Sequence, residues 1–192
     1  WYNLTTHYPW IGMRTAELDG AHVEYFRGIS NPMSVKIGTT VTAKHLQGLI
    51  DTLNPDNEPG RLSFITRFGA QEIEEHLPRV IEAVRATDSH VLWICDPMHG
   101  NTETTTHGYK TRDFDNIVSE LQTAFRIHHE EGSNLGGVHL ELTGENVTEC
   151  IGGARGLQAS DLAKAYKSQV DPRLNYEQAM EVAMRIAGQL NG

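Results

Sequence analysis

A histidine and two acidic residues of this 192-residue chain could together hold a metal ion. His99, Glu141 and Asp171 lie at three successive loop starts, in the segments DPMHGNT, HLELTGEN and DPRLN. Spacings of 42 and 30 residues are too long for a zinc finger, but they suit ligands gathered from neighbouring strand ends. One imidazole with two carboxylates suits divalent manganese, iron, cobalt or zinc. The alternative is a structural role, in which His99 hydrogen-bonds within its loop and Asp171 caps a helix.

Three basic residues form a second cluster. Arg14, Lys36 and Arg67 lie at or just beyond successive strand ends, in a chain whose formal net charge is −9. If they converge, their cationic groups would bind a small anion that carries phosphate. Lys36 and Arg67 interrupt runs predicted to be buried, where an unpaired charge is costly. Ordinary surface charge therefore explains these two less well than it explains Arg14.

Short apolar runs alternate with segments of helical period, which predicts an α/β fold with a parallel sheet. The predicted strands are Ser34–Ile37, Leu62–Thr66, Val91–Cys95 and Gly137–Leu142. Helical stripes run over residues 46–53, 73–84 and 114–125, and two more helices are predicted after caps at Ser160 and Asn175. Parallel strands bring their carboxyl ends to one edge, so both clusters should meet there.

The length bounds the architecture. The chain falls short of the roughly 250 residues of a closed (β/α)₈ barrel. We predict a single domain over residues 1–192 with four or five βα repeats, either half a barrel or a small open sheet. Because such a piece leaves two sheet edges and interior apolar side chains uncovered, we predict that it is not a stable monomer.

Composition excludes several classes of protein. The acidic balance argues against a nucleic-acid binder, and no apolar run approaches the ~20 residues of a membrane span. Cys95 and Cys150 lack a Cys-x-x-Cys partner, which predicts buried thiols in a reducing, cytoplasmic setting. The chain opens at Trp1 rather than Met, which suggests a piece of something longer.

The other histidines have no partner pattern. His128 and His129 lie at a predicted helix end, where they are expected to face solvent. His139 is predicted to be a strand residue packed under the sheet.

Seven segments, taken in order, resemble the type II 3-deoxy-D-arabino-heptulosonate 7-phosphate (DAHP) synthases. They are WIGMRTAELDGAHVEYFRGISNP, VKIG, LNPDNEPGRLSFITRFGA, CDPMHGNT, GYKTRDFDNI, GGVHLELTGENVTEC and DPRLN. The similarity runs from about Trp10 to the last helix. It implies a (β/α)₈ TIM-type barrel, of which this chain covers about the last four or five βα units.

The resemblance also implies an activity: condensation of phosphoenolpyruvate with erythrose 4-phosphate, the first step of the shikimate pathway. The family is metal-dependent, with a Cys, a His, a Glu and an Asp as ligands, and His99, Glu141 and Asp171 match three of these. The expected ion is Mn²⁺ or Co²⁺, with Zn²⁺ and Fe²⁺ as alternatives. Lys36 and His99 are the implied catalytic residues. The positions implied to bind phosphoenolpyruvate are Trp10, Met13, Arg14, Lys36 and Arg67.

Two departures from the family matter. Met13 stands where the family has Glu in its WIGERT motif, and a thioether cannot ionise, so lowered or altered activity is the hypothesis. Val170 stands where a Cys often precedes the Asp of DPRLN. In addition, the family's metal-binding Cys, a second phosphoenolpyruvate arginine and its Lys-Pro-Arg-Ser loop for erythrose 4-phosphate have no counterpart in this chain.

Those absences imply a complementary N-terminal half or a homo-oligomer as partner. Two alternatives to the synthase remain open at this point. One is a non-catalytic half-barrel that binds or regulates while retaining phosphate and metal ligands. The other is a different metal-dependent aldol-type enzyme built from paired half-barrels. The expected location is the cytoplasm, or the plastid for a plant protein.

Overall fold

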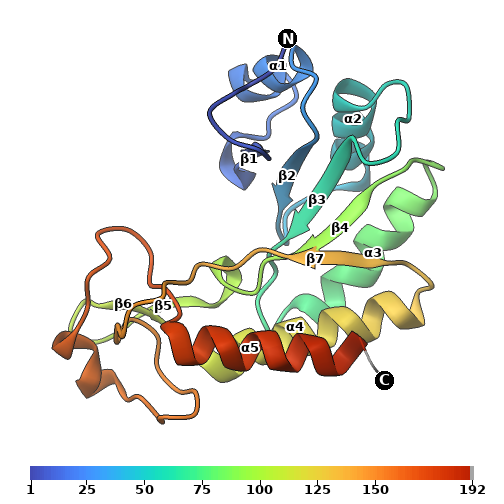
Figure 1. Cartoon of the computed structure of the whole chain (residues 1–192). Helices are drawn as coiled ribbons and strands as arrows, with labels where there is room; N and C mark the ends of the chain where they lie inside the picture. Colours follow the sequence, from blue (N-terminus) through green and yellow to red (C-terminus); the bar gives the residue numbers. More distant parts are fainter. Residues whose placement is uncertain (191–192) are drawn as a thin grey trace.

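Five parallel strands form one sheet in a computed structural model, which describes residues 1–190 (Figure 1). In sheet order they are β1 Trp10–Ile11, β2 Met33–Ile37, β3 Leu62–Thr66, β4 Leu92–Cys95 and β7 Leu135–Val138. Every adjacent pair is parallel, and chain order equals spatial order. This is the arrangement of a barrel section, and it confirms the predicted α/β fold of four or five βα units.

Helices follow the strands and form an outer layer (Figure 1). They are α1 Ala21–Arg27, α2 Ala43–Leu53, α3 Ile73–Arg85, α4 Phe114–Glu130 and α5 Tyr176–Leu190. Consecutive helices pack side by side. Short 3₁₀ helices are η1 Met13–Thr15, η2 His99–Asn101 and η3 Ala159–Lys164. The helical stripes predicted for α2, α3 and α4 point inward, as their spacing requires.

The core lies between the sheet and the helices. All five residues of β2, and all five of β3, are buried. On the helix side, residues such as Leu49, Leu77 and Leu121 are almost completely covered. A strand buried on both faces must carry few polar groups, so Lys36 within β2 needs a specific partner.

The fourth predicted strand was misplaced. β7 spans Leu135–Val138 rather than Gly137–Leu142. The N–H of His139 still donates to the carbonyl of Cys95, but the chain then leaves β4, and Leu142 forms a bridge with Leu174 instead. Glu141 therefore lies in an extended segment beyond the sheet and is not part of a strand.

The predicted exposure of His128 is wrong. His128 and His129 do lie at the end of α4, which runs to Glu130, and His129 is exposed as expected, but His128 faces the core and is 2% exposed. Its Nδ1 lies 2.5 Å from the Ser133 hydroxyl, and its ring lies against Trp93. Burial lowers the pKa of His128 to about 4.

The two predicted C-terminal caps have different outcomes. Asn175 does cap α5, because its Oδ1 accepts from the Gln178 N–H at 2.9 Å. Ser160 is not a cap. It lies inside η3, which begins after Gln158. The N-terminus of η3 is capped by a capping box between Gln158 and Asp161.

The sequence did not predict an antiparallel hairpin, β5 Thr102–Thr104 with β6 Lys110–Arg112. Together with the long segment 139–175, it lies beyond the carboxyl ends of β4 and β7 (Figure 1). We call these two pieces the arm. The arm carries Glu141 and Asp171, so much of the metal cluster comes from irregular structure.

Two expectations from the composition concern the cysteines and the membrane, and both can be compared with the structure. Cys95 and Cys150 are buried free thiols, as predicted, and burial raises the pKa of both. None of the helices within residues 1–190 combines the length and apolar character needed to cross a membrane.

Candidate metal and anion site

Lys36 crosses the sheet interior to a buried carboxylate. Its Nζ lies 2.9 Å from Asp96 Oδ2, and the two side chains are 7% and 0% exposed. Asp96 directly follows β4, and Lys36 belongs to β2, so the pair spans the intervening strand β3. A buried lysine with a buried partner is a specific arrangement, since either charge alone would be costly there.

Asp96 also holds the metal-ligand histidine. Its carboxylate accepts from His99 Nδ1 at 2.7 Å and from the His99 N–H at 3.1 Å. Burial alone would raise the pKa of Asp96, but His99 and Lys36 together hold it well below its ordinary value. Because a carboxylate can only accept, His99 must carry its proton on Nδ1, which leaves Nε2 free to bind a metal.

The three predicted metal ligands do converge. One ligand atom from each of His99, Glu141 and Asp171 lies within 4.8 Å of the other two, and all three side chains are partly buried. His99 Nε2 is 3.4 Å from Glu141 Oε1. One imidazole and two carboxylates from three separate segments fit a divalent transition metal. The donor set therefore agrees with the divalent metal site expected from the sequence.

An arginine that sequence reasoning missed binds one of these ligands and the backbone next to another. Arg112, at the end of β6, is completely buried, and its Nη1 donates to Glu141 Oε2 at 2.5 Å and to the Pro172 carbonyl. Burial would raise the pKa of Glu141, but His99 and Arg112 lower it to about 2. Glu141 is thus ionised at neutral pH, as a metal ligand must be.

Asp171 lies in a loop that a second buried carboxylate organises. Glu149 accepts from the backbone N–H groups of Lys167, Ser168 and Arg173 at 2.8–3.0 Å. It also accepts from the Arg173 guanidinium at 2.8 and 2.9 Å. Asp171 itself pairs with Lys110 of β6 at 3.2 Å.

Two of the three predicted anion-binding residues meet at His99. Lys36 Nζ lies 3.4 Å from His99 Nδ1, and Arg67 Nη2 donates to the His99 carbonyl at 2.9 Å. The Nε of Arg67 is buried and has no hydrogen-bond partner within the described residues. An unsatisfied buried guanidinium N–H is a ready donor for an anion.

The third basic residue stands apart from this pair. Arg14 is exposed on η1 and makes no ion pair within residues 1–190. Trp10, on β1, lies closer to the site: its ring is 5.9 Å from Lys36 Nζ and packs edge-on against His139 at 5.1 Å. His139 is half-buried at this end of the sheet and not packed beneath it, which corrects the prediction.

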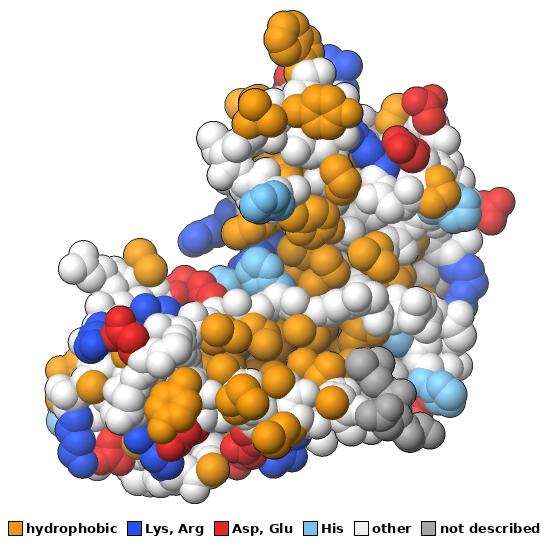
Figure 2. Space-filling model, viewed as in Figure 1, with side chains coloured by type: hydrophobic (Ala, Val, Ile, Leu, Met, Phe, Trp, Pro, Cys, Tyr) orange, Lys and Arg blue, Asp and Glu red, His pale blue; other side chains and the backbone are white. Residues whose placement is uncertain are grey.

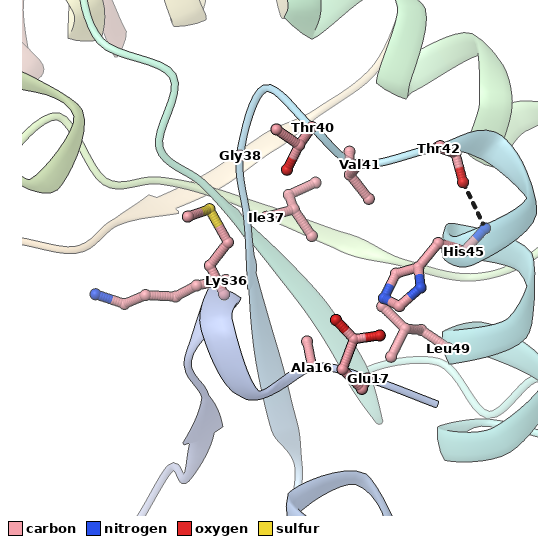
Figure 3. A pocket seen from close by; sticks show the side chains of 11 residues that line it. Ala16, Glu17, Lys36, Ile37, Gly38, Thr40, Val41, Thr42, His45 and Leu49 are labelled. Atoms are coloured by element: carbon pink, nitrogen blue, oxygen red, sulfur yellow. Dashed lines mark hydrogen bonds between the residues drawn. The ribbon is translucent and has the colours of Figure 1, made fainter. Parts of the chain in front are cut away.

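Met13 fills space beside Lys36. It helps to line a cavity of about 190 Å³ between the start of α2 and the end of β2. Its thioether covers Gly38, where an added Cβ would collide with the sulfur. Figure 3 shows Lys36 extending away from His45 and from α2, so the ammonium group serves the Asp96 side of the site.

The residues missed from the sequence act mainly through partners elsewhere in the chain, although Asp96 also binds His99, three residues away. Asp96 stood at a predicted strand end, which is the only signal that could have singled it out. Arg112 lay in the segment GYKTRDFDNI, which carried the resemblance without any role assigned. Glu149 had no local pattern at all.

Comparison with known proteins settles the family. A model described as the class-II DAHP synthetase family matches residues 1–187. The chain belongs to this family. A family relative named phospho-2-dehydro-3-deoxyheptonate aldolase AroG, from Mycolicibacterium smegmatis, is 50% identical over 189 residues. Another from Neurospora crassa, named phospho-2-dehydro-3-deoxyheptonate aldolase, is 52% identical over 189 residues.

Each match covers nearly all of this chain but less than half of the relative. They cover 98% and 97% of this chain but only 41% and 39% of the two relatives. The chain therefore spans about two-fifths of the length of the curated relatives it matches. The resemblance inferred from the seven segments is confirmed.

Proposed function

We propose that this chain carries the metal site and part of the phosphoenolpyruvate site of a DAHP synthase. The reaction is the condensation of phosphoenolpyruvate with erythrose 4-phosphate, with release of inorganic phosphate. The observation that carries the proposal is the convergence of His99, Glu141 and Asp171 beside two cations, Lys36 and Arg67. Family membership and the names of both relatives favour this reading over a non-catalytic binding module.

Each residue has a distinct task in this proposal. His99, Glu141 and Asp171 would hold Mn²⁺ or Co²⁺, with Zn²⁺ or Fe²⁺ as alternatives. The bound ion supplies Lewis-acid polarisation of the aldehyde oxygen. Lys36 and Arg67 neutralise the phosphate and carboxylate of phosphoenolpyruvate and orient its enol carbon toward the aldehyde.

We further propose that a complementary region completes the site. The relatives are more than twice as long as the matched segment. In the family, the fourth metal ligand, a second arginine and the erythrose 4-phosphate loop come from outside the part matched here. Either a complementary N-terminal region or association with another chain would supply them.

A chimera tests the activity directly. The matched 189 residues of the M. smegmatis relative are replaced by the corresponding residues of this chain. With Mn²⁺, the chimera should consume phosphoenolpyruvate and form a product of the mass of DAHP, and a chelator should stop it. The H99A chimera should lose at least ~100-fold in rate, because a metal ligand is gone.

Two results would count against the proposal. Unchanged turnover in H99A would exclude this metal site from catalysis. A folded chimera that binds Mn²⁺ but forms no product would favour the binding module. The M13E chimera tests the departure at Met13: a faster rate is expected on restoring the carboxylate, and an unchanged rate contradicts that hypothesis.

A further inference from the structure

A buried carboxylate with no task so far lies beneath the site. Glu120, on α4, is 0% exposed and makes no hydrogen bond to any proposed metal ligand or anion-binding side chain. Fully buried glutamates are rare because the charge loses its hydration. Its surroundings must therefore compensate the charge.

Three N–H donors surround this carboxylate. Glu120 Oε1 accepts from the backbone N–H groups of Phe68 and Gly69 at 3.0 and 2.9 Å. Its Oε2 accepts from Asn101 Nδ2 at 2.7 Å. Phe68 directly follows Arg67, and Asn101 ends the 3₁₀ turn that begins at His99. One side chain thus binds both the anion-binding loop and the metal-ligand loop.

The same two loops also contact each other directly. Asn101 Oδ1 accepts from the Ala70 N–H at 2.9 Å, and Arg67 Nη2 donates to the His99 carbonyl at 2.9 Å. A Cβ added at Gly100 would collide with the backbone of Gly69. With backbone against backbone, a shift of one loop must move the other.

We propose that Glu120 is a positioning residue that fixes Arg67 relative to His99, and hence the bound phosphate relative to the metal. The effect on phosphate and metal rests on the proposed function, whereas the contacts of Glu120 with the two loops do not depend on it. A carboxylate can accept from all three donors, whereas an amide of the same shape must turn its own N–H toward one of them.

Burial and the hydrogen bonds act in opposite directions on the charge of Glu120. Burial raises the pKa of Glu120 to about 7, although the hydrogen bond from Gly69 opposes the shift, and nearby Asp96 raises it further. The carboxylate that accepts all three bonds therefore predominates above neutral pH, and both tests below are run at about pH 8. The three convergent donors account for a carboxylate at this position.

The first test needs no ligand. Amide hydrogen exchange by NMR compares the unmodified chain with E120Q and with E130Q, the same change at an exposed position of α4. E120Q should speed exchange about tenfold in residues 67–70 and 98–101, because a charged hydrogen-bond acceptor is lost. E130Q should leave both loops unchanged. If E120Q leaves both loops protected, the inference is overturned.

The second test measures binding. Calorimetry gives the affinities for Mn²⁺ and for phosphoenolpyruvate of the same variants placed in the chimera described above. E120Q should weaken both by about tenfold, whereas E130Q should leave both affinities unchanged. A merely structural glutamate would lower the melting temperature and leave both affinities intact, which would overturn the inference.

The two tests separate this inference from the proposed function. If the chimera without further substitution binds neither Mn²⁺ nor phosphoenolpyruvate, the proposed site fails, and hydrogen exchange alone still decides whether Glu120 positions the loops. If it binds both and E120Q binds them equally well, the function stands and the positioning role falls.

Discussion

Asp96 accepts four hydrogen bonds at the centre of the site. It accepts from Lys36, from the His99 ring and from two backbone N–H groups. Sequence analysis identified Lys36 as a buried charge in need of a partner, but its partner lies 60 residues away. Pairing at that distance is set by strand register, and a single sequence does not specify it.

Removing the charge of Asp96 should damage metal binding and stability together. D96N keeps the shape but leaves Lys36 buried without a counter-ion and His99 without its orienting acceptor. We expect Mn²⁺ affinity to fall by about 10–100-fold and the free energy of unfolding by about 3–5 kcal/mol. Calorimetry and urea denaturation measure the two effects. A D96N chain that binds Mn²⁺ with unchanged affinity would contradict this role.

Glu120 makes the stability pH-dependent in a defined direction. Its pKa is about 7 in the folded chain, against an ordinary value of 4.5. Between these values the folded state holds a proton that the unfolded state has lost, so stability falls as pH rises through this window. Relative to E120Q, the unmodified chain should lose about 3 kcal/mol between pH 4.5 and 7. Urea denaturation at several pH values measures the difference, and a difference independent of pH would refute it.

At the scale of elements, the periodicity of apolar residues predicted the positions of the regular helices and strands. The helical stripes of α2, α3 and α4 and the apolar runs of β2, β3 and β4 were located to within a few residues. The arm was missed because its order comes from single buried charges, Arg112 and Glu149, and not from a repeat. A stripe of apolar residues predicts which face of an element is buried. A lone Glu or Arg predicts no structure until its partners are known.

The arm should loosen when Glu149 loses its charge. E149Q removes an acceptor shared by three backbone N–H groups and the Arg173 side chain, so the segment 164–173 should become sensitive to proteolysis. Because Asp171 lies in that segment, Mn²⁺ affinity should fall by about tenfold. Limited proteolysis with mass spectrometry and Mn²⁺ titration measure these effects. E103Q, at an exposed glutamate in β5 of the same arm, is the matched control. Equal cleavage of both variants would exclude the anchoring role.

At the scale of the whole molecule, the main sheet has two uncovered edges within the described residues. Within the described residues, β1 and β7 each have one neighbouring strand, so both sheet edges are open. Figure 2 shows apolar side chains gathered on the face that carries β7 and α5. The exposed large apolar residues there include Leu92, Leu142, Met180 and Met184.

Such a surface should make the isolated chain self-associate. Open edges and apolar patches of this kind favour pairing with another chain. Sedimentation should show dimers or larger species at micromolar concentration. Supplying the unmatched region of the M. smegmatis relative as a separate chain should shift the distribution toward a defined heterodimer. A monomer that unfolds cooperatively and ignores the added chain would refute this expectation.

The agreement between chain order and strand order also affects how the site is assembled during synthesis. Lys36, Arg67 and His99 belong to or follow the successive strands β2, β3 and β4, whereas Glu141 and Asp171 belong to the arm and are synthesised later. The anion-binding cations are therefore in place before the carboxylate ligands arrive. A nascent chain halted before residue 171 would carry the phosphate-binding half of the pocket and could not yet close around a metal. Metal binding by these three ligands should therefore report that the arm has folded.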